Sequence, residues 1–490
     1  MTSSTDHGQR YGQWIAPKFD GALLIWPDAS SLPAIARDNQ KRLDAADHVH
    51  FAGRSLPDLR ASFRIAHVEP ANVPIIATGH QVELHHPGVW IKDVLAAAVA
   101  KQAGGHALHL HVDTDAPKHL TLKWPGFAEP ITDDPDLFRA AWTGLLHNPS
   151  QAHRQMLHQR AASESKRTAA LIDGLSETQS MQHAPPSLPQ KLAEATDAIN
   201  VELGVAYKTM MMSEQLRRWH PLLCELGNDA ERFAEHYNAA LADYRVEAGL
   251  EAGSERPMPD LATEGDRVEL PFWLDDLERH TRQRLTVSLR PSPALVIGEE
   301  RVPLDPGSLQ TGLSRLRHRV APRAHTLTLF MRLVASDLFL HGIGGGHYDQ
   351  VLDRLLQSYF GLEPPTFAVA SATLLHPEAV GYAPLDLPAL RRRGHALRHA
   401  VLDDEKQSWL ARMNAVDGFF AKRDVFEAMH DRRRELLVRD ADYSKWQRDM
   451  AMAKKQLAWE GELLDRELSF TLQPAERLRA MIDRVRDAVS

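Results

Sequence analysis

The pattern of apolar and polar positions predicts two separate strand–helix–strand units. In the first unit, the β-branched run "VPIIAT" (73–78) predicts a buried strand. The alanine-rich stretch "VWIKDVLAAAVAKQAGG" (89–105) predicts a helix that stops at its two glycines. "HALHLHVDTD" (106–115) then predicts a second strand that ends in acidic residues. A helix that connects two strands in this way implies that the strands are parallel.

The second unit lies between residues 325 and 375. "HTLTLFMRLVASD" (325–337) predicts a helix, and "LFLHGIGG" (338–345) predicts a strand that runs into a glycine turn. "YDQVLDRLLQSYFG" (348–361) has apolar residues at helical spacing, and "PPTFAVASATLL" (364–375) predicts the returning strand. Together the two units predict an α/β fold with a Rossmann-like, doubly wound parallel sheet.

The remaining segments predict how the chain is divided. We expect the first half of the core at 1–149, a helical insertion at 150–250, and the second half of the core at 251–387. Within that second half, "ELPFWLDD" and "RLTVSLRP" predict additional paired strands. Residues 388–490 are dense in charge, with apolar residues three and four apart, and predict a helical, coiled-coil-like C-terminal domain. An apolar stripe on such helices needs a partner, so we expect a homodimer through them.

Composition narrows the class of protein. The net charge of −8 argues against a nucleic-acid binder held by bulk positive charge. The chain has no basic start followed by an apolar segment and no uncharged apolar run of membrane-spanning length, so we expect a cytoplasmic protein without a membrane partner. Its one cysteine, Cys224, lies in the apolar stretch "HPLLCELG" and is expected to be a buried structural thiol.

Candidate functional residues gather where the predicted strands end, which is where doubly wound sheets bind ligands. As catalytic residues we single out His80, His341, Asp113 and Asp115. As ligand-binding or phosphate-binding residues we single out Gly79, Gln81, Lys92, Gly344, Gly345, Gly346 and Ser371. A histidine titrates near working pH, so His80 and His341 are the candidate general bases.

Each of these stretches has two interpretations. The glycines of "HGIGGGHYD" precede a predicted helix and can let its N–H groups approach a phosphate, or they form a tight turn without a ligand. His80 and Gln81 can donate hydrogen bonds to an anion, or they belong to an exposed connection. Lys92 adds positive charge there, or extends into solvent. Ser371 is a candidate for hydrogen bonding. It is not a credible nucleophile, because the sequence shows no base positioned to activate it.

The alternation in "HLHVDTD" supports a competing hypothesis. His109, His111 and Asp113 share one face of a strand and are ligand types for zinc or iron. A metal-dependent hydrolase is therefore an alternative function. The same residues also fit an exposed strand face or a buried hydrogen-bonded pair. Asp113 and Asp115 fit a sugar hydroxyl or a magnesium–nucleotide complex as well.

The order of these pieces resembles the bacillithiol biosynthesis cysteine-adding enzymes. "TGHQVELHHPGVWIK" resembles the family's strand, glutamine-rich loop and helix, with His80 where the family has its first glutamine. "DTD" stands where the family has an acidic cluster with a histidine. Arg332, Asp337, Gly344–Gly345 and "SATL" (371–374) follow in the family's order.

That resemblance implies a Rossmann-like core with a dimerising coiled coil and a nucleotide, ADP or ATP, near the core. It also implies an enzyme that joins an amino-acid carboxyl to an amine on a small, amino-sugar-type acceptor, as the family does with cysteine and a glucosaminyl-malate. The sequence is thus compatible with three functions: this ligase-like enzyme, the metal-dependent hydrolase, and a non-catalytic dimeric assembly protein that uses the C-terminal helices.

Overall fold

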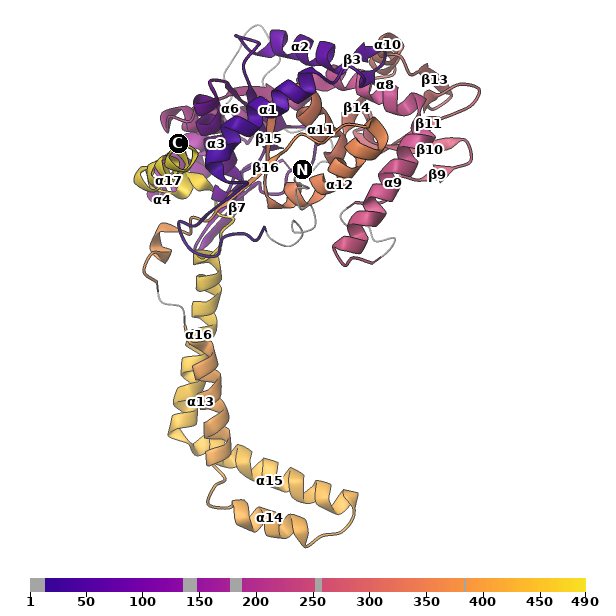
Figure 1. The fold of residues 1–490 in the computed structure, drawn as a ribbon. Coiled ribbons are helices and arrows are strands. Elements are labelled where there is room, and N and C mark those ends of the chain that lie inside the picture. Colours follow the sequence, from indigo (N-terminus) through magenta and orange to yellow (C-terminus); the bar gives the residue numbers. More distant parts are fainter. Residues whose placement is uncertain (1–13, 135–147, 177–186, 252–257, 383–384) are drawn as a thin grey trace, which may run out of the picture. The chain divides into compact units, whose positions relative to one another are not determined.

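The computed structural model describes residues 14–134, 148–176, 187–251, 258–382 and 385–490. The chain divides into two compact units. The larger comprises residues 1–123, 128–374 and 466–490, and the smaller comprises 124–127 and 375–465. Figure 1 labels the elements of both units. Within the described ranges, no helix is both long and apolar enough to cross a bilayer.

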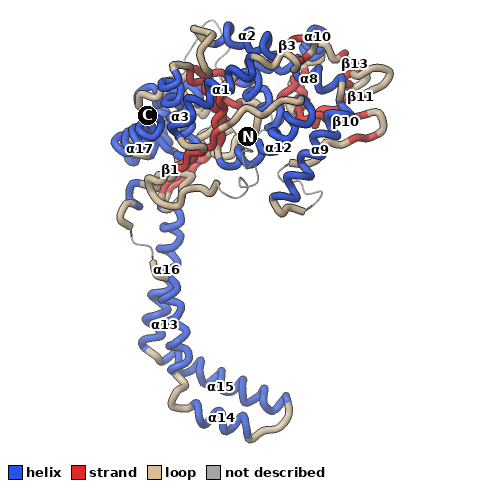
Figure 2. Tube along the Cα trace, in the orientation of Figure 1, coloured by secondary structure: helices blue, strands red, loops and turns tan. Residues whose placement is uncertain are grey.

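A six-stranded sheet forms the centre of the larger unit (Figure 2). Its strands are β1 (Leu23–Trp26), β4 (Ile75–Gln81), β5 (His106–Val112), β8 (Lys208–Met211), β15 (Leu338–His341) and β16 (Ala368–Ala372). They lie in the order β1-β16-β15-β4-β5-β8, and all neighbours are parallel except β1, which is antiparallel to β16. Counted along the chain, the five parallel strands have the order 3-2-1-4-5, which reverses between β4 and β15.

A second, antiparallel sheet belongs to the same unit. It contains β9 (Thr263–Glu264), β10 (Arg267–Asp276), β11 (Thr281–Ser288), β12 (Ala294–Ile297), β13 (Glu300–Pro303) and β14 (His318–Pro322). The expected pairing of "ELPFWLDD" with "RLTVSLRP" is confirmed as the β10–β11 ladder. Two short hairpins complete the strands: β2 (His50–Phe51) with β3 (Arg54–Ser55), and β6 (Thr121–Trp124) with β7 (Phe127–Pro130).

Helices surround the sheets in the larger unit. They are α1 (Leu32–Asp44), α2 (Leu56–His67), α3 (Pro87–Ala103), α4 (Gln151–Glu164), α5 (Lys166–Gly174), α6 (Leu188–Glu202), α7 (Met212–Gln215), α8 (His220–Asn228), α9 (Ala230–Glu247), α10 (Pro306–Arg315), α11 (Ala324–Phe330), α12 (Ile343–Phe360) and α17 (Ala475–Val489). Shorter turns are η2 (Ala29–Ser31), η3 (Leu216–Trp219) and η6 (Phe470–Leu472), and η4 (Met331–Ala335) is a π-helical turn that continues α11.

The smaller unit is helical in its described residues. It contains η5 (Pro377–Ala379), α13 (Leu387–Ala400), α14 (Lys406–Asn414), α15 (Phe419–Arg439) and α16 (Ala441–Leu463). Trp446 of α16 packs on α13, where a side chain at Gly394 would clash with its ring, and its indole Nε1 donates to the Leu390 carbonyl at 2.9 Å. Antiparallel helices of this kind agree with the helical character expected for this region, and the coiled-coil geometry remains a prediction.

The mixed α/β class with a parallel sheet is confirmed, and both strand–helix–strand units are present. β4, α3 and β5 form the first unit, and β15, α12 and β16 form the second. Gly104 takes the left-handed conformation, with φ of 66°, that ends α3 at the expected place. β4 and β5 are largely buried, and their histidines, His109 and His111 of β5 among them, therefore need polar partners inside the protein.

One expectation about these segments was wrong. Gly344–Gly346 do not form a separate turn, because α12 already begins at Ile343 and the glycines make up its first turn. Gly342 is the N-cap residue with an extended backbone, and its carbonyl accepts the first helical hydrogen bond, from the Gly346 N–H at 2.9 Å. The described part of the 150–250 region is mostly helical, as expected, and it also supplies β8 to the edge of the parallel sheet.

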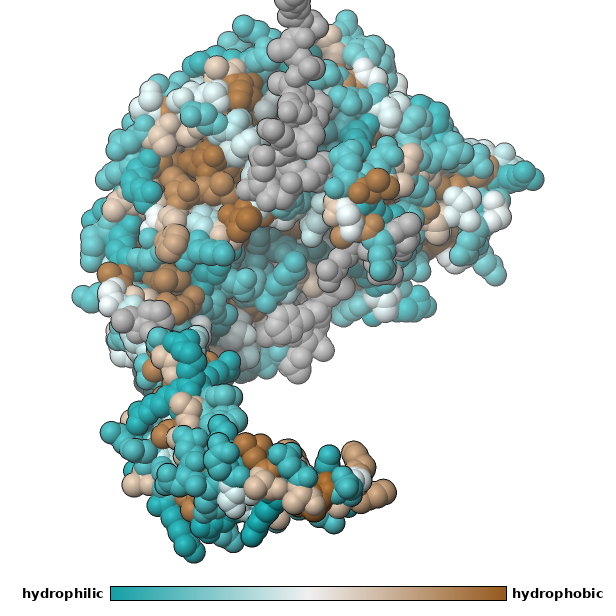
Figure 3. Space-filling view, turned by 60° about the horizontal axis from the view of Figure 1, so that its bottom comes forward, coloured by the Kyte–Doolittle hydropathy of each residue, from teal (hydrophilic) through white to brown (hydrophobic). Residues whose placement is uncertain are grey.

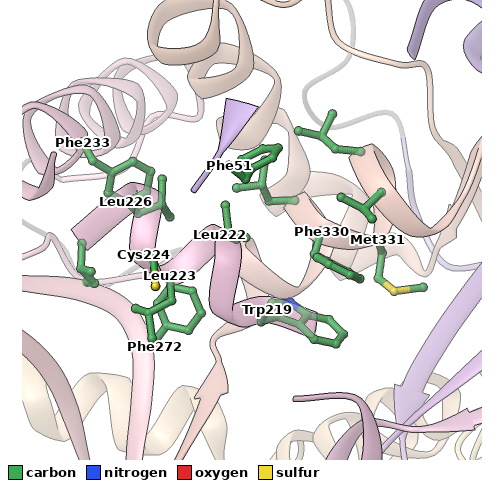
Figure 4. Close-up of a cluster of buried hydrophobic side chains, with 14 of the residues drawn as sticks. Phe51, Trp219, Leu222, Leu223, Cys224, Leu226, Phe233, Phe272, Phe330 and Met331 are labelled. Carbon is green, nitrogen blue, oxygen red and sulfur yellow. The ribbon is translucent and has the colours of Figure 1, made fainter. Parts of the chain in front are cut away.

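A large apolar core joins the two sheets through α8, α9 and α11. Figure 4 shows Phe51, Leu222 and Phe330 close together in this core, with Trp219 beside Phe330. The rings of Trp219 and Phe330 stack with their centroids 4.1 Å apart. Cys224 lies in the same core, fully buried, and burial raises the pKa of its thiol to about 12. The expectation of a buried cysteine is therefore confirmed.

A buried charge cluster fixes the amino ends of the central strands. Both Asp337 oxygens accept hydrogen bonds from Arg64, at 2.6 and 2.7 Å, and one also accepts from Arg60. The other oxygen accepts the Ile75 N–H at 2.6 Å. Asp337 is inaccessible to solvent and precedes β15, while Ile75 begins β4.

Removal of this carboxylate should destabilise the protein strongly. Asp337→Ala leaves the buried guanidinium of Arg64 without a counter-charge and leaves that of Arg60 with Asp44 alone, so we expect the free energy of unfolding to fall by about 3–5 kcal/mol. Urea denaturation followed by circular dichroism measures the change. Asp483→Ala removes an exposed carboxylate of α17 and should alter the free energy of unfolding by less than about 0.5 kcal/mol. Equal effects of the two substitutions would contradict the prediction.

Candidate functional site

The reversal of strand order brings two of the expected strand ends side by side. Leu340 of β15 pairs with Thr78 of β4, so β15 ends at His341 beside Gly79, two residues before β4 ends at Gln81. In open α/β sheets, ligands bind beyond the carboxyl ends of the strands at such a reversal. We call the region around these two ends the crevice.

The start of α12 supplies free backbone donors to the crevice. Gly342 caps the helix without a side-chain hydrogen bond. Among the described residues, the N–H groups of Ile343, Gly344 and Gly345 have no hydrogen-bond acceptor. A Cβ atom at Gly342 or Gly344 would meet nothing within 4 Å, so the helix start faces open space there. Free N–H groups and the positive end of the helix dipole favour an anion at this position.

His341 lies behind the glycines rather than in the open part of the crevice. Its side chain is 4% exposed, and its Nε2 lies 3.0 Å from Asp349 Oδ2. Arg332 donates to the same oxygen at 2.6 Å. Burial opposes ionisation of Asp349, but His341 and Arg332 outweigh it and hold its pKa well below the usual range. A Cβ at Gly345 would lie 2.8 Å from His341 Nδ1, so this ring packs directly under the helix start.

Lys92 reaches the end of β4 from inside α3. Its Nζ donates to the Gly79 carbonyl at 2.9 Å, and the side chain is buried. Burial lowers the pKa of Lys92 from its ordinary value of 10.5 to about 8, although Asp93 and Glu83 partly oppose the shift. The ammonium group therefore gives up its proton more easily than an ordinary lysine. Lys92 does not extend into solvent.

His80 is the more accessible of the two candidate bases. Its side chain is 26% exposed, and its Nδ1 lies 3.2 Å from the Gln81 carbonyl and 3.4 Å from Glu83. Burial of the ring lowers the pKa of His80 well below 6.5, and the nearby charge of Lys92 lowers it further. The imidazole is therefore neutral at pH 7.

Gln81 and Asp115 contact each other where β4 and β5 end. Gln81 Nε2 donates to Asp115 Oδ2 at 3.0 Å and to the Ala116 carbonyl at 3.1 Å. Arg282 of β11 approaches Asp115 Oδ1 at 3.3 Å. The Asp115 carboxylate remains 49% exposed, so it is available to a bound molecule.

Asp113 is in a different situation from Asp115. It is fully buried, and its two oxygens accept the Ser213 N–H at 2.8 Å and the Ser213 hydroxyl at 2.6 Å. These bonds attach the segment after β8 to the end of β5. The structure thus places Asp113 within the fold and Asp115 at its surface.

Ser371 ends β16 beside a cation that the sequence analysis missed. Arg466 Nη2 donates to the Ser371 hydroxyl at 3.2 Å, and Arg466 Nε is buried with no hydrogen-bond partner in the described structure. A Cβ at Gly88 would lie within about 3 Å of both groups, which is why the start of α3 can approach them. Arg466 lies 95 residues after Ser371 in a charge-dense segment, so no local sequence signal identifies it.

The histidines of β5 belong to separate buried pairs. His109 Nδ1 lies 2.6 Å from Asp93, while His111 Nε2 lies 3.0 Å from Asp197. Asp197 also accepts from the Tyr207 hydroxyl at 2.9 Å. Within the residues that the structure describes, no group of three or more His, Cys, Asp or Glu side chains is arranged to hold a metal ion. The alternation of His109, His111 and Asp113 thus fits the buried hydrogen-bonded interpretation.

The structure therefore brings the predicted residues together in three groups. The first is Gly79, Lys92 and His80 at the end of β4, and the second is Gln81 with Asp115. The third is His341 with Gly344–Gly346 at the start of α12. His80 and His341 have different partners, so they belong to separate hydrogen-bond networks.

Lys92 should give the stability of the protein a measurable pH dependence. Between about pH 8 and 10.5 the unfolded chain keeps a proton that folded Lys92 has released, so the free energy of unfolding should rise with pH in this window. A shift of this size corresponds to roughly 3 kcal/mol. Lys92→Met should abolish the rise in urea denaturation curves. Lys101→Met, at an exposed lysine of the same helix, should retain it. A rise that survives in Lys92→Met would contradict the assignment.

No family model matches this chain, and a search of curated proteins finds no match either. The similarity to the cysteine-adding enzymes therefore remains a prediction from the quoted motifs. The chemistry of the crevice is inferred from its own side chains and backbone groups.

Proposed function

We propose that this protein is a ligase-like enzyme, similar to the cysteine-adding enzymes, with a Rossmann-like core that binds ADP or ATP in the crevice. It would join an amino-acid carboxyl to an amine on a small, amino-sugar-type acceptor. The observation that carries the proposal is the free N–H group of Gly344, with its neighbours, at the reversal of strand order. This is the arrangement by which helix starts hold phosphates in doubly wound folds.

The charges around the crevice support an anionic ligand. Lys92 and Arg466 are the cations beside the strand ends, and Arg466 has an unused buried donor. The open space at Gly344 leaves room for a phosphate next to the helix start. ATP would supply a phosphoryl or adenylyl group that turns a carboxylate oxygen into a leaving group.

In this proposal, the side chains that contact the reactants come from the set that contains His80 and from the set that contains Asp115. His80 is neutral and partly exposed, so it can accept the proton that the amine loses when the carbon–nitrogen bond forms. Asp115 can hold a hydroxyl or the ammonium form of the acceptor. His341 is buried against Asp349, so in this proposal it positions the glycines of α12 rather than acting as the base.

We also propose that the smaller unit forms a homodimer. Apolar side chains that gather on a surface mark interfaces with other proteins. The helices of this unit expose several large ones: Leu410, Phe419, Phe420, Phe426 and Met452. Phe419 and Phe420 are 76% and 71% exposed at the start of α15. Brown, hydrophobic side chains are visible on the surface of this unit in Figure 3. A second copy of the chain would cover them.

Occupation of the crevice should stabilise the protein and should depend on Gly344. ADP or ATP at about 100 times its dissociation constant should add about 2.7 kcal/mol of stability, which raises the melting temperature by a few degrees. Gly344→Val places a side chain in the open space of the crevice and should remove this shift. Differential scanning fluorimetry measures the effect.

Gly307→Val is the matched control, because Gly307 is the second residue of α10 as Gly344 is of α12. It should keep the shift produced by the nucleotide. The absence of any shift with wild-type protein, or equal shifts in both variants, would overturn the nucleotide site. Phosphate release from ATP that requires both an amino acid and an amino sugar would then separate a ligase from a nucleotide-binding protein without that activity.

The dimer should dissociate when its apolar contact becomes charged. The double substitution Phe419→Glu and Phe420→Glu introduces two carboxylates at the start of α15 and should shift the protein to monomers in sedimentation velocity experiments. Lys422→Ala, in the next turn, should leave the sedimentation coefficient unchanged. Wild-type protein that sediments as a monomer at every concentration tested would contradict the homodimer.

A further inference from the structure

The larger unit contains a second pocket, formed by segments other than those of the crevice. It has a volume of about 440 Å³ and is lined by residues of β3, α2, α7, η3, α8, α11 and η4. Leu59 and Phe63 of α2 supply apolar lining, together with Phe330 of α11 and Val334 of η4. This size falls within the range of small-molecule sites in proteins.

The apolar lining continues into the protein interior. A small cavity of about 10 Å³ adjoins the pocket, because Leu59, Phe330 and Val334 line both spaces. Phe51 and Leu222 also line this cavity. Figure 4 shows both side chains beside Phe330. An apolar group that enters the pocket therefore meets aromatic and aliphatic side chains on several sides.

Three arginines line the pocket: Arg54, Arg217 and Arg218. Among the described residues, none of them forms an ion pair with a carboxylate. Arg218 Nε donates to Gln215 at 2.7 Å, and its guanidinium lies 5.7 Å from the centre of the Phe63 ring. Arg54 donates to the Ser62 hydroxyl at 2.6 Å. Glu214 is the one acidic residue in the lining, so the charge of the pocket is positive.

Arg218 lies at the boundary between the charged and apolar parts, since it lines both the pocket and the inner cavity. Burial lowers the pKa of its guanidinium, which reflects the partial loss of hydration without a compensating carboxylate. A partly buried cation beside an apolar lining is arranged to pair with an anion that carries an apolar group.

We propose that this pocket binds a small amphipathic anion, an aromatic or short-chain carboxylate or phosphate ester. Its apolar group lies on Phe63, Phe330 and Val334, and its anionic group pairs with Arg218. Because no residue of this pocket belongs to the crevice, the ligand is distinct from the nucleotide proposed above. The pocket also includes a residue of a π-helical turn, a rare geometry that recurs at functional sites.

Isothermal titration calorimetry with full-length protein tests the site. The probes are 3-phenylpropionate and phenyl phosphate, which distinguish a site for carboxylates from a site for phosphate esters. The uncharged analogue is 3-phenylpropanol. We expect saturable binding of at least one anion and at least tenfold weaker binding of the alcohol. Arg218→Met removes a charge-assisted hydrogen bond and should raise the dissociation constant of the anion by roughly tenfold to a hundredfold. Ser62→Trp narrows the opening of the pocket and should weaken binding of the anion as well.

Arg279→Met is the matched control, because Arg279 is 80% exposed on the second sheet and lies outside the pocket. It should bind the probe as wild type does. Three results would overturn the proposal: no saturable binding of either anion, equal binding of the alcohol, or binding that resists both Arg218→Met and Ser62→Trp. Loss of binding in Gly344→Val alone would assign the probe to the crevice instead and would also overturn it.

Discussion

The geometry of the crevice depends on one buried carboxylate at the opposite ends of the same strands. Asp337 is the residue before β15, and it holds Arg60 and Arg64 of α2 and the first N–H of β4. Its carbonyl also accepts from Asn39 of α1 at 2.8 Å. Burial of these charged groups costs solvation free energy. The advantage of the cluster over an apolar contact is therefore conformational specificity and not added stability. It fixes β4 and β15 in one register, and that register decides which residues end the two strands together.

Much of the central sheet was predictable because its signals are local. α3 has strong helix formers and a glycine at its end, β4 begins with a compact apolar run, and β5 alternates apolar residues with histidines. β8 gave no such signal, since Lys208 and Thr209 are exposed at the sheet edge and only Met210 is buried. The glycines after β15 suggested a turn because their helix propensity is poor. Their place in α12 depends on tertiary contacts, since Gly346 packs against Trp14 and Val369 with no space for a side chain.

The site was predictable in position and less so in detail. Strand ends follow from periodicity, so Gly79, His341 and Ser371 could be identified from the sequence. Whether a polar residue faces a ligand or the protein depends on partners far along the chain. Asp113 is covered by Ser213, 100 residues later, whereas Asp115 remains half exposed. Arg466 contacts Ser371 although the two residues are 95 positions apart in the sequence, and no periodic pattern predicts such a contact.

The π-helical turn η4 has a consequence for how the chain tolerates insertions and deletions. Compared with an α-helix, a π-helical turn accommodates one additional residue, and one residue in an α-helix corresponds to a rotation of about 100°. Arg332 in this turn holds Asp349 beneath the start of α12, while Val334 lines the second pocket and Asp337 follows two residues after the turn ends. Loss of a single residue here would turn all of these side chains away from their neighbours at once. The segment 331–337 should therefore keep its length in relatives of this protein, even where its apolar residues are exchanged for one another.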